Sequence, residues 1–154
     1  MKRNLLFGHT EAICKFVNDL APLERAAWPK LCHGIGILRA DGALIAGVVF
    51  ATDREQFGAW EMSAAALSSH AFSTENVNAL GAFAFRQLSA NRVWARTSTD
   101  NKRARALLKG LGFIEEGVNA HHYGPRKNAV VARLLKHEWE RKQAASIPEA
   151  LKAA

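Results

Sequence analysis

Apolar residues recur with a helical period near the start of the chain. Between Thr10 and Leu20 they have the i, i+3, i+4, i+7 spacing that places side chains on one helix face, at Ile13, Phe16, Val17 and Leu20. The pattern predicts a helix that is capped by Thr10 and ended by Pro22. A second short helix is predicted over Leu23 to Trp28, before Pro29.

The helical period returns twice in the second half of the chain. One stripe begins after Ser73 and Thr74, ends near Asn91, and consists of Val77, Leu80, Ala84 and Leu88, with Phe83 beside it. The other stripe consists of Ala104, Leu107, Leu108 and Leu111. Gly112 stands where a left-handed C-terminal cap belongs, and apolar Phe113 follows it. Both stripes therefore predict helices.

Short apolar runs between these helices predict strands. Ile35 to Leu38 and Ala43 to Ala51 are separated by Arg39-Ala40-Asp41-Gly42, in which Asp-Gly provides the positive φ of a tight hairpin turn. The run from Ala43 to Ala51 has no polar alternation, so both of its faces should be covered, as in a central strand. The other predicted strands are Ala59 to Leu67, Arg92 to Thr97, Ile114 to His122 and Asn128 to Leu135. A polar helix or tail closes the chain.

This order of elements predicts an α/β fold in which helices pack on both faces of a central mixed sheet. The chain has 154 residues, 49% of them hydrophobic and 23% charged, which is typical of one globular domain over residues 1–154 with a packed core. No apolar run approaches the roughly 18 residues of a membrane helix, and hydrophobicity ends too soon after Met1 for a signal peptide. We therefore expect a cytoplasmic protein with no membrane partner.

All of the positive charge excess lies in the second half of the chain. Residues 1–77 hold 7 Lys and Arg against 8 Asp and Glu, and residues 78–154 hold 14 against 6. A basic half attracts polyanions, which include nucleic acid, acidic proteins and the phosphates of a cofactor, and charge alone does not choose among them. Cys14 and Cys32 make no disulfide framework, and His121-His122 has no further ligand at metal-binding spacing. We expect reduced thiols and no metal site.

Residues 101–117 read NKRARALLKGLGFIEEG, and this stretch resembles a motif of the GNAT N-acetyltransferases, in which Asn, two residues and Ala or Ser precede an apolar helix that ends in Gly-Phe and an acidic turn. Trp60-Glu61-Met62, Phe72 to Glu75 and Arg92 to Arg96 fit the same template. The resemblance covers residues 34–139, with 140–154 left as a C-terminal helix or tail. It is closest to the branch that includes acetyltransferases of protein N-termini and small phage-type members. It implies the GNAT acyl-CoA N-acyltransferase fold, a central mixed, mostly antiparallel sheet flanked by helices.

The resemblance also implies that acetyl-CoA binds as co-substrate where the fourth and fifth strands splay apart. Its pyrophosphate is expected at the N-terminus of the helix after the fourth strand, where unpaired N–H groups attract anions. The candidate cofactor-binding residues are Leu67, Ser68, His70, Ala71, Phe72, Ser73, Thr74, Asn101, Arg103 and Leu108. Asn101 has two possible roles, which are to contact the pantetheine arm and to cap the following helix.

The phosphate segment departs from the family pattern, which is Gln or Arg, two residues, Gly, one residue, then Gly or Ala. This chain has Ser68, Ala71 and Ser73 in those places. Glycine lets a backbone approach phosphates closely and adopt unusual dihedral angles. The side chains of Ala71 and Ser73 are therefore expected to crowd the phosphates unless the loop has a different conformation.

The resemblance implies that Glu61, on the fourth strand, is the candidate catalytic base that takes a proton from the attacking amine, directly or through water. The alternative for Glu61 is a strand-edge carboxylate that pairs with an arginine. Many relatives use a Tyr on the helix after the fifth strand as the acid, and the matching residue here is Leu108, so that role is not assigned.

The resulting hypothesis is an acetyl-CoA-dependent N-acetyltransferase whose acceptor is a primary amine of a protein, peptide or small molecule. The missing glycines and tyrosine keep open a second hypothesis, a catalytically inactive GNAT-fold binding or structural protein. Nucleic-acid binding through the basic half is a third, less favoured, hypothesis. A homodimer is common in the family and is compatible with the sequence.

Overall fold

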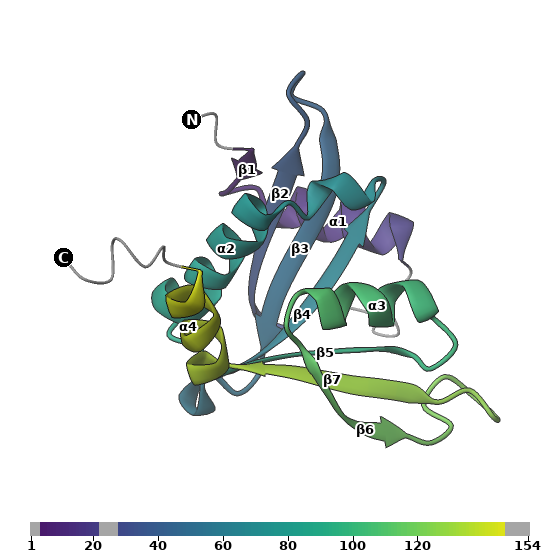
Figure 1. Cartoon of the computed structure of the whole chain (residues 1–154). Helices are drawn as coiled ribbons and strands as arrows, with labels where there is room; N and C mark the ends of the chain where they lie inside the picture. Colours follow the sequence, from purple (N-terminus) through teal and green to yellow (C-terminus); the bar gives the residue numbers. More distant parts are fainter. Residues whose placement is uncertain (1–3, 22–27, 147–154) are drawn as a thin grey trace. The chain divides into compact units, whose positions relative to one another are not determined.

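The computed structural model describes residues 4–21 and 28–146 (Figure 1). They fall into two compact units, drawn from Met1–Ser89 and Ala90–Ala154. Each unit has its own antiparallel strands and its own helices. The short helix predicted over Leu23 to Trp28 lies, except for its last residue, outside the described residues.

The first unit contains four strands in the order β1-β2-β3-β4, and each neighbouring pair is antiparallel. Its elements are β1 (Leu5–Leu6), α1 (Thr10–Leu20), β2 (Leu31–Leu38), β3 (Leu44–Thr52), a 3-10 turn (Glu55–Phe57), β4 (Ala59–Ala66), a second 3-10 turn (Ser69–Ala71), α2 (Thr74–Ala82) and a π-helical segment (Phe83–Gln87). β3 lies between β2 and β4, and all its residues from Ala46 onward are buried, so the prediction of a central strand is confirmed.

Helix α1 has the predicted bounds and packs on one face of this sheet. Ile13, Cys14 and Val17 form a core cluster with Val49 of β3. The predicted role of Thr10 is wrong, because the N-cap is His9 and Thr10 is the first helical residue. The Thr10 hydroxyl instead accepts a hydrogen bond from the backbone N–H of Gly34 at 3.1 Å, so it ties the start of α1 to β2.

The opposite face of the same sheet carries the end of the second helix, and Figure 1 shows α1 behind the sheet and α2 in front of it. Phe83 lies 5.8 Å from the ring of His33 on β2 and 6.0 Å from that of Phe50 on β3, measured between ring centroids. Leu80 and Ala84 of the predicted stripe are buried. The helix was predicted to end near Asn91, but its last turn is π-helical and ends at Gln87.

The hairpin turn between β2 and β3 forms as predicted around Asp41 and Gly42. Gly42 has φ +89°, and its N–H donates to the carbonyl of Arg39 at 2.8 Å. β2 begins at Leu31, earlier than predicted, because β3 continues to Thr52 and offers partners for the added residues. β4 ends one residue earlier than predicted, although the N–H of Leu67 still donates to the carbonyl of Ile45 at 2.8 Å.

The second unit has three strands in the order β5-β7-β6, all antiparallel. Its elements are β5 (Arg92–Ser98), α3 (Lys102–Gly110), β6 (Ile114–Asn119), β7 (Ala129–Leu135) and α4 (Lys136–Ala145). The predicted cap of α3 is confirmed, since Gly112 has φ +95° and the N–H of Phe113 donates to the carbonyl of Leu108 at 3.0 Å. The closing polar segment forms α4 up to Ala145.

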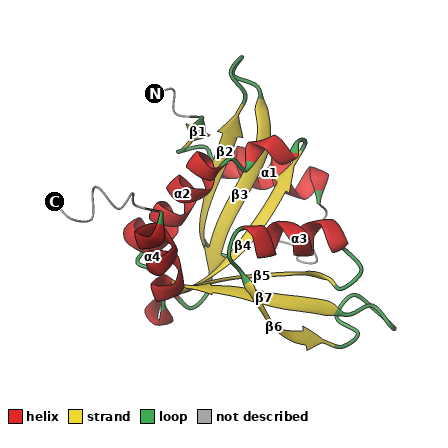
Figure 2. Cartoon of the chain, viewed as in Figure 1, coloured by secondary structure: helices red, strands yellow, loops and turns green. Residues whose placement is uncertain are grey.

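Strand β6 is shorter than predicted, and Figure 2 shows a long loop between it and β7. The prediction that the strand reaches His122 is wrong, because His121 has φ +56° and lies in a turn. The N–H of His121 donates to Oδ1 of Asn128 at 2.8 Å, which closes this loop. The two histidines therefore do not belong to a strand. Across residues 4–21 and 28–146, no three His, Cys, Asp or Glu side chains are placed to hold a metal ion.

Candidate functional site

The segment that joins β4 to α2 leaves backbone donors free at the start of a helix. Ser73 is the N-cap of α2, and its hydroxyl accepts from the N–H of Asn76 at 3.2 Å. No residue in the described ranges accepts a hydrogen bond from the N–H groups of Ser73, Thr74 or Glu75. Unpaired N–H groups and the helix dipole make this end of α2 attractive to an anion, although Glu75 adds one negative charge to the same turn.

The loop before α2 has a conformation that does not need glycine. Ser68 to Ala71 form a 3-10 turn in which the Ser68 hydroxyl accepts from the N–H of His70 at 3.2 Å and the Ser68 carbonyl accepts from the N–H of Ala71 at 3.2 Å. None of the residues from Ser68 to Ser73 has a positive φ. The Ala71 methyl is turned into the protein, since Ala71 is only 1% exposed. The methyl group of Ala71 therefore does not project from the exposed side of the loop, whereas Ser73, the other residue expected to crowd the phosphates, is exposed.

The remaining predicted residues of this loop lie at its surface. Leu67 is 62% exposed, and Phe72 is half-buried. His70, Ser73 and Thr74 are exposed. The loop thus brings all seven predicted residues from 67 to 74 into one short segment, with the hydroxyl groups and backbone donors at its outer side and Ala71 at its inner side.

Sequence analysis missed one polar residue of this segment, Asn76. It is 5% exposed, and its side-chain Nδ2 donates to the carbonyl of Ala71 at 2.9 Å. The available sequence feature was its spacing, because Asn76 stands four residues before the apolar Leu80 and so shares its helix face. A polar residue on an apolar face predicts a buried hydrogen bond.

Glu61 is on β4, as predicted, and is one of three buried polar or charged side chains within the described residues, the others being Thr52 and Asn76. It is 8% exposed and lies opposite Ala51 of β3. Residues that pair across two strands share a face of the sheet, and so do residues two positions apart along a strand. The pair formed by Val49 and Ser63 lies two positions from the pair formed by Ala51 and Glu61, and Val49 belongs to the cluster around α1. Glu61 therefore lies on the face of the sheet that carries α1.

The other predicted residues belong to the second unit. Asn101 is the N-cap of α3, where its Oδ1 accepts from the N–H of Ala104 at 3.0 Å, so the capping role is present and the side-chain amide remains as a donor. Arg103 is exposed and has no ion-pair partner among residues 4–21 and 28–146. Leu108, at the position where relatives have Tyr, is 8% exposed and apolar.

Ion pairs neutralise part of the charge of the second unit. Glu115 accepts two hydrogen bonds of 2.8 Å from the Arg105 guanidinium, which lower its pKa. The pKa of Glu116 is also lowered, first by its hydrogen bond to Arg92 and then by the charges of Arg92 and Arg133. Arg133 in addition contacts Glu138 at 3.0 Å. These pairs use up three of the unit's carboxylates.

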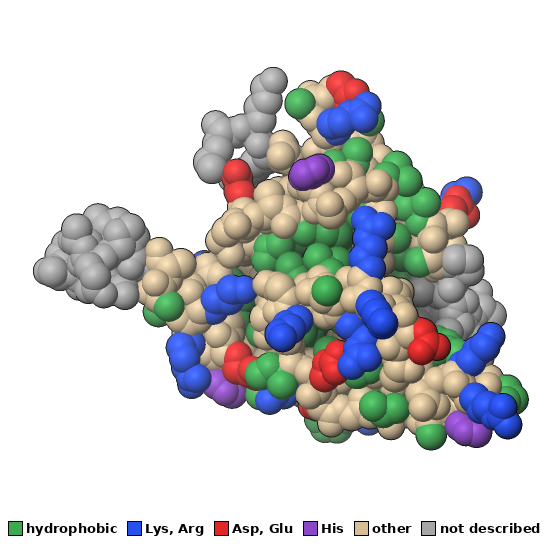
Figure 3. Space-filling view, turned by 45° about the vertical axis from the view of Figure 1, so that its right-hand side comes forward, with side chains coloured by type: hydrophobic (Ala, Val, Ile, Leu, Met, Phe, Trp, Pro, Cys, Tyr) green, Lys and Arg blue, Asp and Glu red, His purple; other side chains and the backbone are tan. Residues whose placement is uncertain are grey.

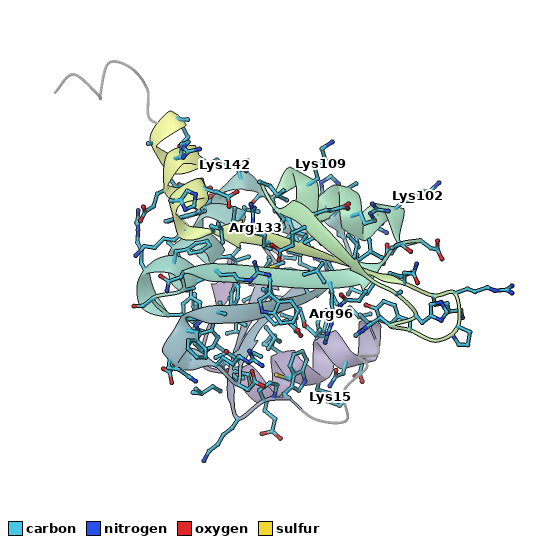
Figure 4. The ribbon with its side chains drawn as sticks, turned by 90° about the horizontal axis from the view of Figure 1, so that it is seen from below. Lys15, Arg96, Lys102, Lys109, Arg133 and Lys142 are labelled. Carbon is cyan, nitrogen blue, oxygen red and sulfur yellow. The ribbon has the colours of Figure 1, made fainter. Side chains whose placement is uncertain are left out.

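The positive charge that remains lies on the surface of this unit. Ala90–Ala154 holds 13 Lys and Arg against 6 Asp and Glu. Figure 3 shows several blue Lys and Arg side chains on the face in view, with red Asp and Glu side chains beside some of them, and Figure 4 shows Lys102 and Lys109 on α3 pointing away from the strands of their unit. The helix that follows Asn101 therefore presents exposed positive charge, on Lys102 and Arg103, that has no ion-pair partner among the residues described.

A family model described as an acetyltransferase (GNAT) domain matches residues 10–114. A curated relative, the putative ribosomal N-acetyltransferase YdaF of Bacillus subtilis, is 37% identical over 65 residues, which cover 38% of this chain. The match spans 33% of the relative's own length.

Solved structures with the same fold include spermidine N-acetyltransferases of Vibrio cholerae. A SpeG chimera with hSSAT has a TM-score of 0.72 at 15% identity and covers 88% of this chain and 97% of that one. A dodecameric structure of the Vibrio cholerae enzyme has a TM-score of 0.71 at 13% identity, over 90% of this chain and 96% of that one. At these identities the likeness shows the fold, which is the one expected from the sequence. None of the helices in the described part of the chain is long and apolar enough to span a bilayer.

Proposed function

The chain belongs to the GNAT acetyltransferase family, and from that premise we propose that it is an acetyl-CoA-dependent N-acetyltransferase that acts on a primary amine of a protein, peptide or small molecule. The observation that carries the proposal is the start of α2, inside the family match, where the N–H groups of Ser73, Thr74 and Glu75 have no acceptor among residues 4–21 and 28–146. Acetyl-CoA supplies the activated acetyl thioester. The amine nitrogen forms a bond to the acetyl carbon, the carbon–sulfur bond breaks, and CoA leaves as a thiol.

The donor set at the start of α2 supports binding of the CoA diphosphate. Backbone N–H groups are good donors to phosphate oxygens, and the exposed hydroxyl of Thr74 adds a side-chain donor. The methyl group of Ala71 does not occupy this side of the loop, because it is buried. Arg103 and Asn101 of the second unit are proposed as further cofactor-binding residues, Arg103 through its positive charge and Asn101 through its side-chain amide.

Glu61 is proposed as the base that takes the proton of the attacking amine. Its support is its place on β4 and its burial, because a carboxylate shielded from water interacts strongly with a nearby cationic amine. No acid is assigned to protonate the leaving thiolate, since the Leu108 side chain has no ionisable group. We propose that it takes its proton from solvent.

The family match also supports the interpretation of residues 1–154 as one domain. It runs from 10 to 114, so it includes residues of both compact units, and the structural likenesses cover 88% or more of the chain. The acceptor is proposed only as an amine class. The relatives named as ribosomal and spermidine acetyltransferases both modify amines, by their names, and they make ribosomal proteins and polyamines the first acceptors to screen.

The decisive experiment is a calorimetric titration of acetyl-CoA and CoA, combined with thermal unfolding. Ligand at about 100 times its dissociation constant is expected to stabilise the protein by roughly 2.7 kcal/mol. Acetyl transfer to an amine panel is then compared for Glu61→Gln and for Glu55→Gln, the same change at an exposed carboxylate of the same unit. Glu61→Gln should lower kcat and leave acetyl-CoA binding unchanged, while the control should alter neither.

Two outcomes would contradict the proposal. Absence of acetyl-CoA binding at millimolar concentration would favour the inactive binding or structural protein. Salt-sensitive binding to RNA or DNA in its place would favour the nucleic-acid hypothesis, because the affinity then falls as the salt concentration rises, with a slope proportional to the number of phosphates contacted. Unchanged turnover in Glu61→Gln would remove only the role of Glu61.

A further inference from the structure

Asn76 is buried at the start of α2 and makes two hydrogen bonds that join the helix to the loop before it. Its backbone N–H donates to the Ser73 hydroxyl at 3.2 Å, and its side-chain Nδ2 donates to the Ala71 carbonyl at 2.9 Å. Only 5% of the residue is exposed. A buried amide in this position gives up its contact with water, so the bond to Ala71 has to be present for the loop to be stable.

The bond between Asn76 and Ala71 closes a short bracket of backbone, residues 71–76. Inside this bracket lie Ser73, Thr74 and Glu75, the three residues whose N–H groups have no acceptor in the part of the chain described here. At the inner end of the bracket, Ala71 is anchored by its buried methyl group. At the other end, Asn76 belongs to the first turn of α2. The free donors are therefore held from both sides.

A loop without glycine has no special backbone conformation with which to set these donors in place. The residues from Ser68 to Ser73 all have negative φ, and their ends are joined by side chains instead. Because fixed donors lose less entropy when they bind an anion than mobile donors do, the bracket should improve the affinity for phosphate groups.

We propose that Asn76 is a positioning residue for the diphosphate of CoA, which it serves by holding the 71–76 bracket and without contacting the ligand. The inference rests on the proposed function, because it assigns to Asn76 a role in the binding of that co-substrate. Its effect is confined to ligands that carry the diphosphate. The binding affinity of a ligand with the same thioester and no diphosphate should not depend on the bracket.

The test compares acetyl-CoA with S-acetylpantetheine, which lacks the diphosphate and the nucleotide. Dissociation constants for CoA and pantetheine, and KM and kcat for the two acetyl donors, are measured for the parent and for Asn76→Leu. Leu is close to Asn in shape and cannot donate to Ala71. The matched control is Asn18→Leu, the same change at an exposed asparagine of α1, in another helix and outside the bracket.

We expect Asn76→Leu to raise the dissociation constant of CoA and the KM of acetyl-CoA by about tenfold, equivalent to one lost hydrogen bond to a charged group. The kcat with acetyl-CoA, the dissociation constant of pantetheine, and the KM and kcat for S-acetylpantetheine should stay at parent values, and Asn18→Leu should change none of the measured constants. If Asn76→Leu does not fold, Asn76→Ala provides the comparison, since it also removes the donor and adds no charge at the start of α2.

Three results would overturn the inference. Equal losses for CoA and pantetheine would mean that Asn76 only stabilises the fold. Unchanged CoA binding in a folded Asn76 variant would mean that the bracket does not position the donors, with the proposed function intact. Failure of the parent protein itself to bind CoA would remove the proposed function, and the inference with it.

Discussion

Replacement of Gly34 by alanine should separate α1 from the sheet on which it packs. A Cβ atom at Gly34 would lie 2.8 Å from the Cβ of Ile13 and 3.0 Å from both the Cα and the carbonyl oxygen of Thr10. These atoms belong to the helix backbone or are attached directly to it, so a change of rotamer does not remove the clash. The helix has to move as a body, and the hydrogen bond from the Gly34 N–H to the Thr10 hydroxyl has to stretch.

The expected cost follows from the close packing of this face. Insertion of one methyl group into a filled core costs about 1–3 kcal/mol. For a protein of this size each kcal/mol lowers the melting temperature by roughly 2–4 °C. Gly34→Ala should therefore melt about 2–12 °C below the parent protein.

Two other glycines provide a graded comparison on the same face. At Gly36 the nearest atoms are Cδ1 of Leu44 at 2.7 Å and Cδ1 of Ile13 at 2.9 Å, which are the ends of flexible side chains. Gly36→Ala should therefore cost less than Gly34→Ala. At Gly47 the nearest atoms are the Cγ2 atoms of Ile13 and Val17, both at 3.0 Å, and β-branched side chains adjust poorly, so its cost should be intermediate.

The assay is thermal and urea unfolding followed by circular dichroism, with Gly110→Ala as the control. Gly110 is in α3, and an added Cβ there meets nothing within 4 Å. Alanine is the better helix former, so the control should gain about 0.5–1 kcal/mol. Parent-like stability of Gly34→Ala, or equal losses at Gly34 and Gly36, would refute the conclusion that backbone contact sets the spacing between α1 and β2.

Other changes test the thiols, the helix cap and the phosphate loop. Burial, followed by the neighbouring Cys32, raises the pKa of Cys14 from 9.0 to about 11, so the folded protein holds that proton more tightly and the free energy of unfolding should fall as the pH rises through this interval. At pH 8 iodoacetamide should modify Cys32 before Cys14 in the native protein, as mass spectrometry of the peptides will show; faster reaction at Cys14 would contradict its burial. Gly112→Ala places an L side chain at φ +95° and should cost about 1–2 kcal/mol in urea unfolding, whereas an unchanged midpoint would mean that the cap contributes nothing. Ala71→Gly loosens the turn before α2 and should weaken CoA binding in calorimetry; tighter binding would show that the Ala71 methyl group faces the ligand after all.

Local sequence patterns determined the elements that depend on interactions between residues close together in the sequence. The 3.6-residue period located α1, and Gly112 with Phe113 located the end of α3. The apolar run after Gly42 predicted that β3 is a central strand, and the motif from Asn101 to Phe113 indicated the family.

The tertiary structure decided the features that depend on partners far away in the chain. The Thr10 hydroxyl has its donor 24 residues away, at Gly34, so helix-capping rules could not assign its partner. Strand β6 stops at Asn119 because the side chain of Asn128 captures the N–H of His121, and no pattern within the strand encodes that contact.

The candidate site divides in the same way. The sequence proposed the 67–74 segment and Glu61 as site residues, and its missing glycines predicted crowding of the phosphates. The fold turns the Ala71 methyl group inward and buries Asn76, and both depend on which residues cover that side of α2. Periodicity says which residues share a face, since it follows from backbone geometry alone. Burial and hydrogen-bond partners depend on what packs against that face, and only the folded chain brings those groups together.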